Sequence, residues 1–168
     1  MILDNRVPQM LTAHFSLQEM CASGTAVRLG IRNVPDSEAR DRLRLLCEHV
    51  LEPLRKNFGV IRVTSGYRCE RLNAIVGGSA RSQHVRGEAA DIHISSIEVG
   101  RKMFQFIKQH LDFDQLLFEH VRGNGACWLH VSYRAGELTK YGLLRLNRRQ
   151  AVDNYVTPPT ACKMAYVY

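Results

Sequence analysis

The chain has 168 residues, of which 45% are hydrophobic, which is enough for one soluble domain with an ordinary core. No stretch approaches the roughly 20 apolar residues that span a bilayer. The formal charge of +7 suits an anionic polymer, but no Lys/Arg-rich block or nucleic-acid motif accompanies it, which argues against nucleic acid as the partner.

The N-terminal part is predicted to form an arm and two helices. Residues 1–14 show no periodicity and lack the basic and apolar regions of a secretory signal, so we expect an arm on a protein made in the cytoplasm. Ser16 and Glu19 have the spacing of a capping box and begin a short helix. A longer helix opens at Pro35, and Pro53 should kink it or begin a new turn. Its apolar stripe recurs at three- and four-residue steps: Leu43, Leu46, Cys47, Val50, Leu51 and Leu54.

Two central segments place polar residues at predicted strands. A short strand over 60–64 is followed by a Ser-Gly turn and Arg68. His84 is followed by a glycine turn at Arg86-Gly87 and then by a predicted strand. Alternation of side chains along this strand puts Asp91 and His93 on one face and apolar residues on the other. The apolar side suits a core, so the polar side should face a cleft. His84 and Asp91 provide an imidazole and a carboxylate, which are two of the three protein ligands of a catalytic zinc site.

A predicted hairpin supplies the remaining candidates. Strands over 114–119 and 127–133 are joined through an Asn-Gly pair at 124–125, which is a strong hairpin signal. Alternation places Glu119 and His130 on the polar side of these strands. If the strands are neighbours in one sheet, a second imidazole and a free carboxylate converge on the first two candidates.

We expect an α+β fold in a single domain, with a small antiparallel sheet and helices packed on one face. Ser95 and Glu98 have capping-box spacing and should begin the helix before the hairpin. We expect the domain to cover 15–146, between the arm at 1–14 and a C-terminal extension at 147–168. The cysteines, scattered and odd in number, are expected to be reduced structural thiols: Cys21, Cys47, Cys69, Cys127 and Cys162.

Three motifs resemble those of one known family. SQHVRGEAAD looks like the S-x-H-x-x-G-x-A-x-D signature of the zinc D-Ala-D-Ala carboxypeptidases, which are proteins of the hedgehog/DD-peptidase fold and of peptidase family M15. TSGYR resembles the family's arginine segment, and WLHVS resembles its final histidine strand; together the motifs cover Phe15 to Tyr133 in the family's order. The resemblance implies that His84, Asp91 and His130 bind Zn²⁺. It also implies that Arg68 binds a carboxylate or carbonyl group of the substrate.

The catalytic carboxylate departs from the family pattern. Relatives carry E-x-x-H or H-x-H at the last histidine, whereas the corresponding positions here are Cys127 and Trp128, respectively. Glu119 is the best substitute, because it ends the adjacent predicted strand with the right parity. Asp114 and His120 are alternatives, although their parity turns both away from the predicted cleft.

The resemblance implies a zinc metallopeptidase that hydrolyses a peptide bond of peptidoglycan, most simply a D-Ala-D-Ala carboxypeptidase. One alternative is an endopeptidase of the same zinc chemistry, as in phage or prophage endolysins. Another is a non-catalytic, zinc-stabilised module that binds the cell wall or belongs to a virion, because one fold can host several functions. We expect a monomer that acts on the cell wall after release or export.

Overall fold

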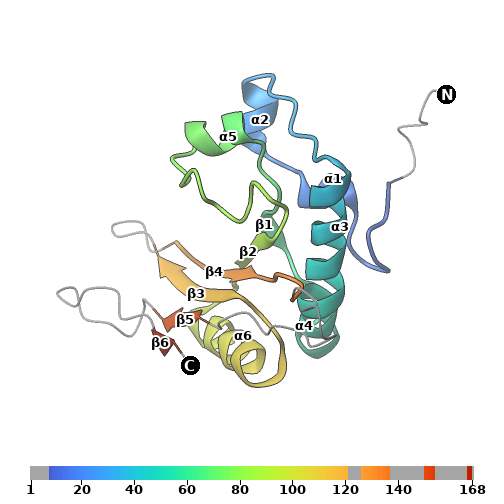
Figure 1. The fold of residues 1–168 in the computed structure, drawn as a ribbon. Coiled ribbons are helices and arrows are strands. Elements are labelled where there is room, and N and C mark those ends of the chain that lie inside the picture. The colour runs from blue at the N-terminus through green and yellow to red at the C-terminus, as the bar shows by residue number, and fades with distance from the viewer. Residues whose placement is uncertain (1–7, 121–125, 137–149, 154–165, 168) are drawn as a thin grey trace.

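A mixed sheet covered by helices on one face forms the body of the protein (Figure 1). The computed structural model describes residues 8–120, 126–136, 150–153 and 166–167. In these ranges the strand order is β1-β2-β4-β3-β5-β6. The strands are β1 (Val63–Ser65), β2 (Ala89–His93), β3 (Gln115–His120), β4 (Cys127–Ser132), β5 (Gln150–Asp153) and β6 (Tyr166–Val167).

The helices lie mostly before the sheet in the sequence, and α6 lies between β2 and β3. They are α1 (Leu17–Met20), α2 (Gly24–Arg28), α3 (Ser37–Leu46), the π-helical η1 (Cys47–Leu51), α4 (Glu52–Phe58), α5 (Glu70–Ile75) and α6 (Ile97–His110). None of the helices within the described ranges is long and apolar enough to cross a membrane.

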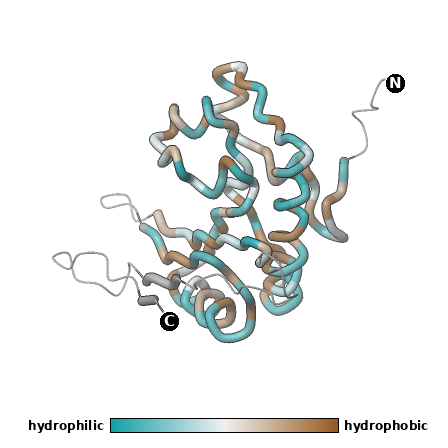
Figure 2. Tube along the Cα trace, in the orientation of Figure 1, coloured by the Kyte–Doolittle hydropathy of each residue, from teal (hydrophilic) through white to brown (hydrophobic). Residues whose placement is uncertain are grey.

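The core lies between one face of the sheet and α3, η1, α4 and α6. Ile92, Leu116 and Leu129 are completely buried on that face, whereas Asp91 and His130 alternate with them and point to the other. Figure 2 shows apolar and polar residues interspersed along α6, β3 and β4, as expected of elements with one buried face. The predicted α+β fold is therefore confirmed.

The sheet differs from the prediction at its far edge. The order β1-β2-β4-β3 is antiparallel throughout, but β5 pairs with β3 in parallel and β6 then pairs with β5. The sheet is thus mixed, and short strands from 150–153 and 166–167 extend it. The predicted Asn-Gly turn at 124–125 lies outside the described residues.

The helical predictions are confirmed with local differences. The long helix changes to π-helical hydrogen bonding in η1 just before Pro53, which lies in the first turn of α4 and cannot donate an amide hydrogen bond. Helix α6 begins one residue later than expected, because the hydroxyl of Ser96, not Ser95, accepts the amide of Val99. Strand β1 begins at Val63 instead of residue 60.

Candidate metal centre

Antiparallel pairing of β2 and β4 places Asp91 directly opposite His130. Opposed residues on one face of such a pair have Cβ atoms about 5 Å apart, close enough for side chains to meet. Here the Nδ1 atom of His130 lies 2.8 Å from Oδ1 of Asp91. The register of two central strands therefore positions two of the three predicted ligands.

His84 reaches the same point from the loop that precedes β2. Its side chain is buried, with Nδ1 2.7 Å from the carbonyl oxygen of Gly66 and Nε2 3.3 Å from Oδ1 of Asp91. The loop lies close against α3, since a Cβ atom at Gly87 would collide with the backbone carbonyl of Ala39. Gly87 also has a φ of +74°, which strongly favours glycine.

One ligand atom from each of His84, Asp91 and His130 lies within 4.8 Å of the others. Burial opposes ionisation of Asp91, but hydrogen bonds from His130 and His84 outweigh it and hold the pKa of Asp91 well below its usual range. The carboxylate is therefore charged and ready to bind a cation. Two imidazole nitrogens and one carboxylate oxygen form a donor set suited to divalent transition metals, so the cluster could hold a metal ion.

Arg68, the residue expected to bind substrate, lies beside this cluster. Its Nη2 atom is 3.5 Å from Oδ2 of Asp91, and its buried Nε atom has no hydrogen-bond partner among the described residues. Burial lowers the pKa of Arg68, and the charges of Asp91 and Glu119 partly oppose that shift. The guanidinium stays charged because an arginine pKa is far above neutral.

The backbone around Arg68 is held by an amide side chain from the loop after α2. Asn33 Nδ2 donates to the carbonyl oxygens of Cys21 and Tyr67, and Asn33 Oδ1 accepts the amide of Cys69. The amide of Arg68 itself donates to the carbonyl of His84. These contacts join the arginine segment to the histidine loop.

Glu119 shares the polar face of the sheet with His130. Glu119 pairs with Trp128 of β4, which is two residues before His130 in the same strand. The side chain of Glu119 is half-buried. Its charge also contributes to the pKa of Arg68. The structure therefore brings Glu119 to the same region as the metal donors.

The alternative candidates have other surroundings. Asp114 precedes β3 and accepts a hydrogen bond of 2.7 Å from Nε2 of Gln83, and Arg134 lies 3.7 Å from the same carboxylate. His120 ends β3, but its side chain lies outside the described residues. His93 is exposed on the polar face of β2.

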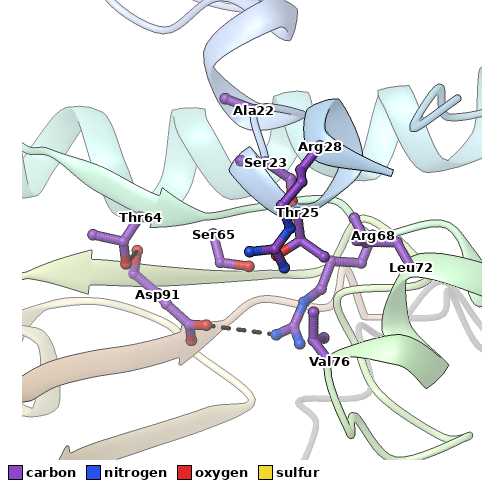
Figure 3. Close-up of a pocket in the computed structure, with 11 residues that line it drawn as sticks. Ala22, Ser23, Thr25, Arg28, Thr64, Ser65, Arg68, Leu72, Val76 and Asp91 are labelled. Carbon is purple, nitrogen blue, oxygen red and sulfur yellow. Dashed lines mark hydrogen bonds and ion pairs between the residues drawn. The ribbon is translucent and has the colours of Figure 1, made fainter. Parts of the chain in front are cut away.

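A pocket of about 650 Å³ adjoins the cluster and is lined in part by residues of α2 that the sequence analysis did not single out (Figure 3). Thr25 and Arg28 belong to α2, and Ser23 is the N-cap residue that precedes it. The sequence pattern predicts no helix in this segment. The available signal was Ser23, whose hydroxyl accepts the amide of Ala26 and caps α2.

Comparison with known proteins agrees with this arrangement. The peptidase M15 family matches residues 13–132, a range that contains the three donor residues, Arg68 and Glu119. No curated protein matches the chain. Because the match covers well over half of the 168 residues and the whole candidate centre, the chain belongs to the peptidase M15 family of metallopeptidases.

Proposed function

We propose that this protein is a zinc-dependent peptidase of peptidoglycan, of the D-Ala-D-Ala carboxypeptidase type. The observation that carries the proposal is the meeting of His84, Asp91 and His130 next to a pocket that contains Arg68. Membership of the M15 family supports metal-dependent peptide hydrolysis. The resemblance of the three sequence motifs supports the choice of zinc and of the substrate.

His84, Asp91 and His130 would hold the zinc ion. Catalytic zinc sites commonly use three protein ligands and leave one position open. A zinc ion bound here would activate a water molecule and polarise the scissile carbonyl group. The protein contributes an ionised Asp91 and a His84 ring whose orientation is fixed by the carbonyl of Gly66.

Two further side chains have roles in the proposed reaction: one transfers a proton and the other binds the substrate. Glu119 accepts the proton of the attacking water and delivers it to the leaving amine. This role is supported by the position of Glu119 on the polar face of β3, where it lies opposite Trp128, two residues from His130 in β4. Arg68 binds a carboxylate of the substrate and positions the peptide, a role that suits its charge and planar donor array.

The test is a digest of purified muropeptides, with and without a metal chelator, read by mass spectrometry. Release of one terminal alanine, lost with chelator and restored by zinc, is the expected result. Separation of cross-linked peptides without release of alanine would instead identify an endopeptidase. Zinc binding and pelleting with cell wall, without any cleavage, would show a binding module and overturn the proposal.

A further inference from the structure

The pocket beside the metal centre contains a second arginine, which comes from α2. Asp91 and Arg68 line the pocket, so it is continuous with the candidate metal centre. Figure 3 shows the side chain of Arg28 reaching from α2 into the space that the Arg68 guanidinium also faces. A volume of about 650 Å³ lies within the range of small-ligand pockets and leaves room for a terminal residue of a peptide.

The charges of the pocket favour an anion. Arg28 is exposed and forms no ion pair with any residue in the described parts of the chain. The acidic residue of the lining, Asp91, is engaged through Oδ1 by His84 and His130, and its Oδ2 lies 3.5 Å from Nη2 of Arg68. The buried Nε donor of Arg68 has no hydrogen-bond partner in the part of the chain that the structure describes. The pocket lining therefore has two guanidinium groups, Arg28 and Arg68, and one carboxylate, Asp91, which belongs to the candidate metal site. The net charge of the lining is positive.

The remaining lining suits a small amino acid with a free carboxylate. Ser23, Thr25 and Ser65 bring hydroxyl groups, which can donate hydrogen bonds to carboxylate oxygens. Leu72 and Val76 of α5 give the pocket an apolar side that suits a short aliphatic side chain. A planar carboxylate matches the donor fork of arginine better than a single point charge would.

The position of Arg28 is built into the fold. The hydroxyl of Ser23 caps α2, and Ala26 on its buried side packs in a small cluster with Ile31 and Leu72. This cluster fixes α2 against α5, the helix that provides the apolar side of the pocket. Arg28 thus projects from an anchored helix.

We propose that Arg28 and Arg68 together bind the C-terminal carboxylate of the residue that leaves the substrate. Arg28 is then a specificity-determining residue that makes the enzyme prefer the last peptide bond of a chain. This inference rests on the proposed function and defines its substrate class as peptides that end, with a free carboxylate, one residue beyond the cleaved bond.

Arg28→Gln in the full-length zinc-loaded protein tests the proposal, with Arg71→Gln as the control of equal charge change on α5 outside the pocket lining. Each protein is given a stem peptide ending in D-Ala-D-Ala and the same peptide with a C-terminal amide. Arg28→Gln should lower kcat/KM for the acid by about 10- to 100-fold, the loss expected for a charge-assisted hydrogen bond. The amide should be cleaved slowly and equally by all three proteins. Equal losses on acid and amide in Arg28→Gln would overturn the proposal.

A binding measurement separates this inference from the proposed activity. Calorimetry of N-acetyl-D-alanyl-D-alanine with the metal-free protein should show binding that Arg28→Gln weakens about 10-fold or more and Arg71→Gln leaves unchanged. The amide of the same dipeptide should bind weakly to every variant. If the wild type cleaves nothing yet shows this pattern, the peptidase function fails and the carboxylate subsite stands. Identical affinity of wild type and Arg28→Gln for the acid dipeptide rejects the subsite, whatever the activity.

Discussion

The Nδ1 atom of His84 lies 2.7 Å from the backbone carbonyl oxygen of Gly66. A carbonyl oxygen only accepts hydrogen bonds, so Nδ1 carries the proton and donates it. Because Nδ1 is committed to this bond, Nε2, which lies 3.3 Å from Oδ1 of Asp91, is the ring atom that would bind a metal ion. A contact between two loops thus fixes the tautomer of a candidate metal ligand.

The tight packing of Gly66 makes this contact testable. A Cβ atom there would collide with the backbone carbonyl of Met20, so Gly66→Ala must displace the loop that holds His84. We expect zinc affinity to fall by about 10- to 100-fold, the usual effect of losing a partner that orients a ligand. Competition with a chromogenic chelator measures this. Gly24→Ala is the control, because a Cβ atom at Gly24 meets no described residue within 4 Å. Equal zinc affinity in both variants would contradict the assignment.

The donor cluster should couple zinc binding to folding stability. Zinc at 100 times its dissociation constant stabilises a protein by about 2.7 kcal/mol, so saturation should raise the melting temperature by about 5 °C or more. His130→Ala removes one donor and should abolish the rise. His93→Ala removes an exposed imidazole from the same face of the sheet and should preserve it. Differential scanning calorimetry with and without zinc checks both, and a full zinc-dependent rise in His130→Ala would exclude this centre.

Alternation along strands made much of the site predictable from the sequence. Asp91 beside the buried Ile92 and His130 beside the buried Leu129 have the parity that the pattern indicated, and pairing of β2 with β4 brings them together. His84 depended on motif resemblance, because no local pattern places a loop residue against a strand. Arg28 was not identified, since a five-residue helix lacks the periodicity that reveals longer ones.

Other differences have physical causes as well. Parallel pairing of β5 with β3 joins segments separated by about 30 residues, and pattern within either segment says nothing about its partner. The N-cap of α6 is Ser96 and not Ser95, because adjacent serines offer the same hydroxyl and only backbone geometry selects one.

Substitution of Glu119 separates metal binding from turnover. Glu119→Gln keeps the size of the side chain but removes the base, so zinc content should be unchanged while kcat falls by about 10²- to 10⁴-fold. Asp114→Asn is the matched control, because Asp114 is bound by Gln83 and Arg134. It should keep most of the turnover. Zinc analysis and muropeptide kinetics on both variants check the assignment; a fully active Glu119→Gln would falsify it.

The buried carboxylate of Glu88, the residue before β2, should matter for folding stability and not for catalysis. The Glu88 side chain is 6% exposed and has Arg86 at 2.9 Å, Arg134 at 3.5 Å and Arg42 at 3.9 Å. Glu88→Gln leaves three arginines facing a neutral group. Because these arginines are partly exposed and solvated, we expect a loss of about 1–3 kcal/mol, below the value for a fully buried pair.

Urea denaturation measures the effect of Glu88→Gln. Glu38→Gln is the control, because it breaks an exposed ion pair with the same Arg42 at 2.7 Å. The control should change the free energy of unfolding by less than about 1 kcal/mol. If the two substitutions changed the free energy of unfolding equally, burial of the Glu88 carboxylate would add nothing to its contribution to stability.

Asn33 is expected to act on the substrate through Arg68 without touching it. Its amide bridges the backbone on both sides of Arg68, through the carbonyl of Tyr67 and the amide of Cys69. Asn33→Ala leaves these partly buried groups unpaired, which should cost about 1–3 kcal/mol of folding free energy and loosen the arginine. The KM for a peptide with a free carboxylate should then rise several-fold while zinc affinity stays constant. Asn57→Ala removes a comparable amide-to-backbone bond, to Pro53 at an exposed site, and should change neither quantity. A normal KM in a destabilised Asn33→Ala would limit Asn33 to a structural role, whereas a raised KM with intact zinc binding would identify it as the residue that positions Arg68.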